Sequence, residues 1–180
     1  MPDTQRVADV CRKHFGNVEC REGDDKSVFI TALDHMVEFE DGKAPVQFLM
    51  TSCMDFDGKT VDDFTRSQMW DCQESRDRIL EECRYSMLAT DFLARGLSSL
   101  ERANLEMDYL EVLAELFLSC EAFFFSGSGK LFEAEEIRGN QIEGPDRFIR
   151  YAVNVRFFTI QGSDDMQVDT LGMNTLFLPD

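Results

Sequence analysis

The segment SGSGK, residues 126–130, holds the glycines and the lysine that could bind phosphate. A phosphate-binding loop needs G-x-x-x-x-G-K-[ST], in which backbone amides surround the phosphates, the lysine reaches the terminal ones and the hydroxyl holds magnesium. Gly129 and Lys130 supply only the Gly-Lys pair, since Phe124 occupies the first glycine position and Leu131 the hydroxyl position. We therefore predict a strand-to-helix turn, with at most a weak anion site where the helix begins.

A second polar group lies in the apolar segment AVNVRFFTI, residues 152–160. As a strand, this segment alternates between two faces, with Val153, Val155 and Phe157 on one and Asn154, Arg156, Phe158 and Ile160 on the other. A strand this apolar is predicted to be central in a sheet, so Arg156 needs an acidic partner there.

The partner expected for Arg156 is Asp169 on the following strand. If GSDD, residues 162–165, forms a four-residue loop, Phe158 faces Asp169 and Arg156 lies diagonal to it on the same face. Two interpretations stay open. One is a structural Arg–Asp pair, and the other is a ligand-binding patch made by Ser128, Lys130, Asn154, Arg156 and Asp169.

Metal binding and nucleophilic catalysis have little support. Cys11 and His14 share a helix face, but two ligands are too few for structural zinc, so no metal is predicted. GSDDMQVD lacks the EF-hand pattern, and Asp164 and Asp165 are read as turn residues.

Nucleophilic catalysis lacks a sequence motif. SGSG is not G-x-S-x-G, because Ser126 stands two residues before Ser128. A Cys–His pair or a carboxylate pair assembled in space stays open.

The charge balance limits the partners. The 180 residues include 35 Asp and Glu against 18 Lys and Arg, a formal net charge of −17. Nucleic acid and anionic membranes are bound mainly through Lys and Arg, so neither is an expected partner. The charge favours solubility, or a basic protein partner.

The six cysteines, at positions 11, 20, 53, 72, 83 and 120, form no C-x-x-C pair. The chain is long, rich in apolar residues, and shows neither an apolar leader at its N-terminus nor a run of membrane-spanning length. Buried, reduced cysteines in a cytoplasmic protein are the simplest interpretation. No cofactor is predicted.

Local signals in the N-terminal half predict one helix, three strands and a second helix. Asp3 or Thr4 caps a helix that ends at Gly16, and Asp41-Gly42 marks a hairpin among three strands between Asn17 and Cys53. The second helix covers residues 67–83 and points Trp70, Ile79, Leu80 and Cys83 inward. Residues 84–92 are predicted to be a buried strand.

In the C-terminal half the strongest signal is a helix over residues 99–118, with a capping box formed by Ser98 and Glu101. Its apolar stripe contains Ala103, Met107, Leu110, Ala114 and Phe117, with Leu113 beside it. A buried strand is expected at residues 121–126, an acidic helix at 132–138, a turn-rich connection at 138–146, and a final hairpin of two strands.

The C-terminal half, residues 70–180, resembles the bacterial domain-of-unknown-function family numbered 4261. The resemblance rests on the isolated Trp70, the run from YSMLATDF to EAFFFSGSGK, and the ending VDTLGMNTLFLPD. The positions that match in this ending are Thr170, Gly172, Met173, Leu178, Pro179 and Asp180. The resemblance implies a bacterial cytosolic protein, brings no established activity, and suggests a chain truncated at its C-terminus.

Together these patterns predict one α+β domain over residues 1–180, a two-layer sandwich of a mixed, mainly antiparallel sheet with two longer helices on one face. We expect a non-enzymatic binding or interaction module, such as an immunity-like or accessory factor. The alternative is a hydrolase whose site is assembled from residues near the Gly-Ser loop and the last hairpin. A homo-oligomer stays open.

Overall fold

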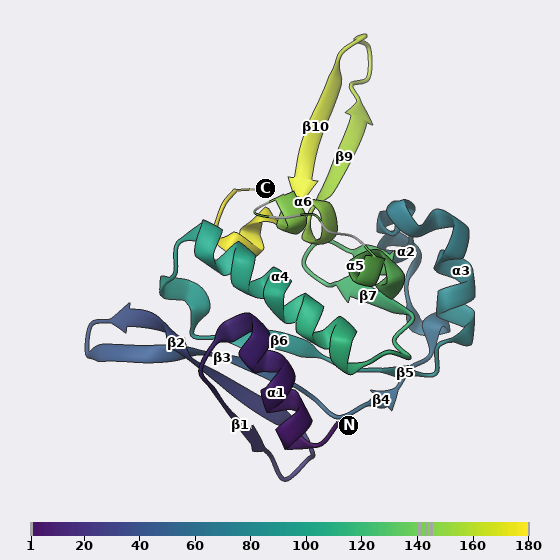
Figure 1. The fold of residues 1–180 in the computed structure, drawn as a ribbon. Coiled ribbons are helices and arrows are strands. Elements are labelled where there is room, and N and C mark those ends of the chain that lie inside the picture. Colours follow the sequence, from purple (N-terminus) through teal and green to yellow (C-terminus); the bar gives the residue numbers. More distant parts are fainter. Residues whose placement is uncertain (1, 140–141, 143, 145, 180) are drawn as a thin grey trace.

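The computed structural model describes residues 2–139, 142, 144 and 146–179, and its main sheet lies in the N-terminal half (Figure 1). This four-stranded antiparallel sheet has the order β1-β2-β3-β6. Its strands are β1 (Val18–Glu22), β2 (Val28–Phe39), β3 (Gly42–Met50) and β6 (Ala89–Phe92). The three strands predicted between Asn17 and Cys53 are confirmed, and the hairpin at Asp41-Gly42 joins β2 to β3.

Helices α1 (Thr4–Phe15) and α4 (Ser99–Leu116) lie side by side and cover one face of this sheet (Figure 1). The predicted caps are confirmed, since Asp3 accepts from the backbone N–H of Arg6 and Ser98 forms a capping box with Glu101. The rings of Phe15 and Phe48 stack 4.8 Å apart, joining α1 to β3. The α+β class, with two longer helices on one sheet face, is confirmed.

Helix α4 is buried on two sides. Leu105, Tyr109, Val112 and Leu116 face the core that α1 and the sheet form. Four members of the predicted stripe face the other way, where Ala103, Met107, Leu110 and Ala114 pack with Phe132, Phe148 and Tyr151 of the C-terminal half. Phe117 and its neighbour Leu113 belong to the sheet core instead. The C-terminal half therefore forms a third layer on α4, because this helix supplies apolar side chains to two cores.

The predicted helix over residues 67–83 is wrong as a single element. The chain forms α2 (Asp63–Gln68), a 3₁₀ turn η2 (Trp70–Cys72) and α3 (Gln73–Glu82). Met69 ends α2 and is buried with Cys72, Ile79, Leu80 and Leu131, so the chain bends to bring Met69 into this small core. Trp70 consequently points outward and is 45% exposed.

The single buried strand predicted for residues 84–92 is also wrong. The chain forms two short strands, with β5 (Tyr85–Ser86) pairing with β4 (Met54–Asp55) and β6 pairing with β3. Tyr85 and Leu88 are exposed. The segment changes partners midway because it runs from the α3 layer to the edge of the main sheet (Figure 1).

The Gly-Ser loop joins two strands instead of a strand and a helix, which corrects the prediction. It links β7 (Ala122–Phe125) to the antiparallel β8 (Lys130–Glu133), and helix α5 (Ala134–Gly139) begins only after β8. The strand predicted as buried is half-exposed at Phe124. Because Lys130 lies within a strand, no helix begins at this loop, and the weak anion site left open there loses its helix N-terminus.

A helix that the sequence did not predict follows. Helix α6 (Asp146–Ala152) includes residues 150–152, which were expected to begin the first strand of the final hairpin. It forms because Phe148, Tyr151 and Ala152 turn one face into the core shared with α4. Part of the turn-rich connection before it, and Asp180 of the family resemblance, lie outside the described residues.

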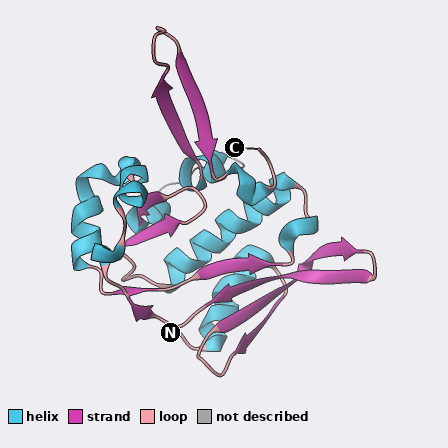
Figure 2. Ribbon diagram, turned by 180° about the vertical axis from the view of Figure 1, so that it is seen from behind, coloured by secondary structure: helices cyan, strands magenta, loops and turns pink. Residues whose placement is uncertain are grey.

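The last two strands, β9 (Asn154–Thr159) and β10 (Met166–Leu171), form a two-stranded antiparallel sheet of their own. We call this hairpin the arm. It extends away from the other layers, as Figures 1 and 2 show from opposite sides. The predicted central position of β9 is therefore wrong, and its apolar side chains are not in the core. No helix in the described part of the chain has the length and apolarity to cross a membrane.

Candidate functional site

Three of the predicted site residues meet at the base of the arm. Lys130 is only 5% exposed, and its Nζ lies 2.8 Å from Asp71 Oδ2 and donates to the carbonyl of Val153 at 3.0 Å. A buried ammonium group needs a paired charge and bonded neighbours, and these two contacts provide both. Lys130 thus binds η2 on one side and the residue before β9 on the other.

Asn154 completes this base and is fully buried. Its side-chain amide donates to the carbonyls of Gln68 and Ser128, both at 2.9 Å. Ser128 is also buried, and its Oγ accepts from the backbone N–H of Lys130 at 3.3 Å. Ser128 Oγ, Lys130 Nζ and the side-chain N–H groups of Asn154 are bonded mainly to backbone, which favours a role in anchoring the arm, whereas the buried Asn154 Oδ1 accepts no hydrogen bond from the described residues.

Gly172 closes the other side of the base. An added Cβ there would lie 2.4 Å from the carbonyl oxygen of Ala152 and 3.0 Å from the Cβ of Ser128, and its φ is +108°. Both the space and the backbone angle therefore require glycine. The end of β10 packs tightly against the start of β9 and the Gly-Ser loop.

Arg156 and Asp169 lie one step further along the arm, on the face that carries Asn154. Arg156 donates from Nε to Asp169 Oδ1 at 2.8 Å and from Nη2 to Oδ2 at 2.5 Å. The pair is confirmed, but the predicted register is wrong, since Asp169 lies directly opposite Arg156 and Phe158 lies opposite Gln167. The hairpin turns one residue earlier, as Ile160 and Asp165 still pair through their backbone.

The arm exposes apolar side chains to solvent. On the face that carries Val155, the neighbours Phe157, Met166 and Val168 are 63%, 62% and 55% exposed. Phe158 and Ile160 on the opposite face are also exposed, and the Arg156 guanidinium lies 5.3 Å from the centre of the Phe158 ring. An isolated two-stranded hairpin is marginally stable in water, and exposed apolar groups commonly mark an interaction surface.

The tip of the arm is acidic. Asp164 and Asp165 are exposed, and Ser163 Oγ bonds to Asp165 at 2.7 Å, which confirms that both acids belong to the turn. The only cation of the arm, Arg156, is paired with Asp169. The outer end of the arm is thus apolar and negatively charged.

A buried carboxyl group elsewhere in the fold was missed by the sequence analysis. Glu106 on α4 lies 3.0 Å from Arg102 Nε, but that nitrogen donates to Asp91 on β6, so Glu106 Oε1 accepts no hydrogen bond from the described residues. Burial and the nearby Asp91 carboxylate raise the pKa of Glu106 to about 8, although Arg102 opposes the shift. No sequence signal distinguishes Glu106 from the exposed acids of the same helix.

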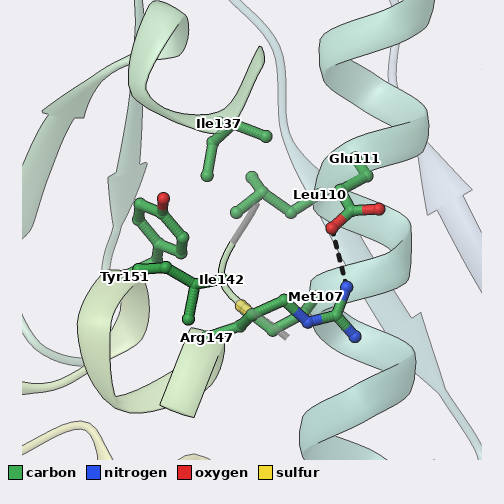
Figure 3. Close-up of a pocket in the computed structure, with 7 residues that line it drawn as sticks. All are labelled: Met107, Leu110, Glu111, Ile137, Ile142, Arg147 and Tyr151. Atoms are coloured by element: carbon green, nitrogen blue, oxygen red, sulfur yellow. Dashed lines mark hydrogen bonds and ion pairs between the residues drawn. The ribbon is translucent and has the colours of Figure 1, made fainter. Parts of the chain in front are cut away.

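A small cavity lies between α4 and α6. It is lined by Met107, Leu110, Glu111, Ile137, Ile142, Arg147 and Tyr151, and Arg147 is bonded to Glu111 across its edge (Figure 3). Its volume of about 10 Å³ suits a single water molecule and excludes a small-molecule substrate.

A larger surface hollow of about 420 Å³ lies between α1 and β1, with Cys20 on its wall. A hydrogen bond from Cys11 lowers the pKa of the Cys20 thiol, and Arg12 contributes in the same direction. All six cysteines are free thiols.

His14, Asp108 and Glu111 form a group whose ligand atoms lie within 4.8 Å of one another. From the sequence, His14 was considered as a ligand together with Cys11, but Cys11 is fully buried. The two acids could not be found from spacing alone, because α1 and α4 are far apart in the sequence.

Comparison of the chain with protein-family models, with curated proteins and with solved structures finds no match. The resemblance to the family numbered 4261 therefore stays an expectation, and the candidate sites must be judged by their geometry.

Proposed function

We propose that this chain is a non-enzymatic interaction module that binds a basic partner protein through the arm. The exposed apolar face of β9 and β10 is the observation that carries the proposal. Both strands lie at an edge of their two-stranded sheet, so each offers unpaired backbone groups to an added strand of the partner. Binding would bury Phe157, Met166 and Val168 and would extend a hairpin that is short on its own.

The charge of the molecule selects the kind of partner. The chain carries a net charge of −17, and the arm ends in Asp164 and Asp165. A basic protein is attracted to this surface, whereas a second copy of the chain carries the same charge and is repelled. The partner would present Lys and Arg beside an apolar, extended segment, in the cytoplasm where reduced cysteines are expected.

The hydrolase alternative is less well supported. Its expected residues Ser128, Lys130 and Asn154 are buried and hold backbone carbonyls or amides. Arg156 and Asp169 bind each other. The geometry therefore favours the interaction module.

Site-specific photo-cross-linking in the cells that naturally produce the chain tests this proposal. A benzophenone amino acid replaces Phe157 or Val168 on the arm, and in a matched control it replaces Phe64, an equally exposed side chain on α2. We expect a cross-linked protein, rich in Lys and Arg, at the two arm positions and none at Phe64. The identified partner, once purified, should lose affinity for the chain as salt is added.

Three outcomes would overturn the proposal. They are no cross-link at the arm, the same product at Phe64 as at the arm, or a product consisting of two copies of this chain. The last outcome would show that the arm mediates a homo-oligomer. A binding loss of at least about tenfold on Phe157→Ser, with no loss on Phe64→Ser, is the quantitative expectation for a central apolar contact.

A further inference from the structure

A second group of side chains that could do chemistry lies where α1, α4 and α6 meet. His14 comes from α1, Asp108 and Glu111 lie one turn apart on α4, and Arg147 comes from α6. The imidazole and the two carboxylates each bring one ligand atom to within 4.8 Å of the others. His14 Nδ1 lies 3.7 Å from Glu111 Oε2. In a tetrahedral zinc site the ligand atoms are about 3.4 Å apart, so small side-chain rotations suffice.

Arg147 bonds to one oxygen of each carboxylate. It donates from Nη2 to Asp108 Oδ1 at 2.9 Å and from Nη1 to Glu111 Oε1 at 2.7 Å. The second oxygen of each carboxylate makes no hydrogen bond with the described residues. Figure 3 shows Arg147 reaching Glu111 from the side of the small cavity. Arg147 is thus placed to orient both carboxylates, as groups behind metal ligands commonly do.

The ring nitrogens of His14 lack the hydrogen bonds expected of a buried histidine. The ring is mostly buried, yet neither ring nitrogen forms a hydrogen bond with the described residues. Carboxylate oxygens of Glu111 and Glu115 lie 3.7 Å from Nδ1 and 3.9 Å from Nε2. A buried imidazole is normally bonded at one nitrogen or both. Three carboxylates surround the ring. Arg147 pairs with Asp108 and Glu111, and Lys13 pairs with Glu115, so two positive charges face three negative ones.

We propose that His14, Asp108 and Glu111 bind a divalent transition-metal ion, represented here by Zn²⁺. One nitrogen and two oxygen ligands suit this class of ion, whereas Mg²⁺ prefers oxygen alone. Three protein ligands leave a coordination position for water. The ion would join α1 to α4 and would be supported by α6 through Arg147. This inference does not depend on the proposed function of the arm.

The two histidines make the test direct. Imidazole ¹H–¹⁵N spectra of the chain, without any polyhistidine tag, are recorded during titration with ZnCl₂, and His35→Gln assigns the two rings. We expect the His14 signals to shift and to saturate at one equivalent, while the His35 signals stay in place. MgCl₂ should move neither ring. The titration itself uses the unaltered chain, and only the assignment of the two rings needs a variant.

Calorimetry and thermal unfolding complete the test. Glu111→Gln should weaken zinc binding by at least about tenfold, and Glu19→Gln, an exposed change away from the junction, should not. Zinc at 100 times its Kd should raise the Tm of the wild-type chain by about 5 to 10 °C. Equal responses of both histidines, no response of His14 to millimolar zinc, or full binding by Glu111→Gln would each overturn the proposal.

Discussion

Glu106 has a carboxyl group that the fold holds in its protonated form at neutral pH. Its pKa is 4.5 as a free side chain and about 8 in the folded chain, chiefly because of burial. The folded state therefore binds one more proton than the unfolded state between these values. The stability that this proton confers is fully present below pH 4.5 and is lost as the pH rises through 8.

Replacing this group by a neutral isostere should remove that pH dependence. Between pH 5 and pH 9, the free energy of unfolding should fall further in the wild type than in Glu106→Gln. The difference between the two falls should be on the order of 3 kcal/mol. Urea unfolding across this range measures the difference. Glu19→Gln should follow the wild type, and parallel curves for Glu106→Gln and wild type would contradict the prediction.

Lys130 gives a second prediction about a single buried side chain. Lys130→Met removes the cation that pairs with Asp71 and the donor that reaches the Val153 carbonyl. The Asp71 carboxylate then stays partly buried without the Lys130 cation. We therefore expect the free energy of unfolding, measured with urea, to fall by about 3 kcal/mol. Adding Asp71→Asn should recover part of this loss, whereas the exposed change Lys59→Met should cost nothing measurable.

At the scale of elements, the arm should respond differently from the body. Arg156→Ala removes the bidentate pair with Asp169 but touches no buried cluster. We expect faster amide hydrogen exchange throughout β9 and β10, while exchange in α4 stays unchanged, since the arm can open locally. Mass-spectrometric exchange resolves these segments. A fall in the global Tm as large as that of a core variant would show that the arm belongs to the cooperative body.

Local signals in the sequence were sufficient to predict some features of the fold. Asp3, Ser98 and Glu101 cap their helices as predicted, because a cap depends on residues within one turn. The pairing of Arg156 with Asp169 was also predictable, because a register shifted by two residues leaves each side chain on the same face of the hairpin. These features depend on few neighbours, so composition and spacing decide them.

Other elements depend on partners that are distant in the sequence. The polarity of β9 resembles that of a core strand, and a sequence pattern cannot distinguish side chains buried by the chain itself from those left on a surface. Lys130 is buried because Asp71 meets it from η2. α6 is held by a core that α4 completes. In each case the tertiary neighbour determines the structure and the local pattern does not.

At the scale of the whole molecule, α4 links two cores. Leu105 belongs to the sheet core and Met107 to the C-terminal core, so a cavity beside either residue weakens the same helix. Leu105→Ala and Met107→Ala should each cost about 2–5 kcal/mol and shift one common transition. Circular dichroism and the fluorescence of Trp70, the single tryptophan, should give coincident curves. Two separate transitions in either variant would mean that the cores unfold independently.

The base of the arm has a consequence for how the molecule can be rebuilt. Asn154 pairs with Leu171, so the chain leaves the body and re-enters it at neighbouring positions, about 5 Å apart as in any antiparallel pair. Val153 and Gly172, on either side, are already buried in the body. The part of the arm beyond Asn154 and Leu171 is therefore a segment that a short turn or a foreign hairpin can replace without removing the contacts of the base. Recognition could then change by exchange of a single segment, while the layers that fold the chain stay as they are.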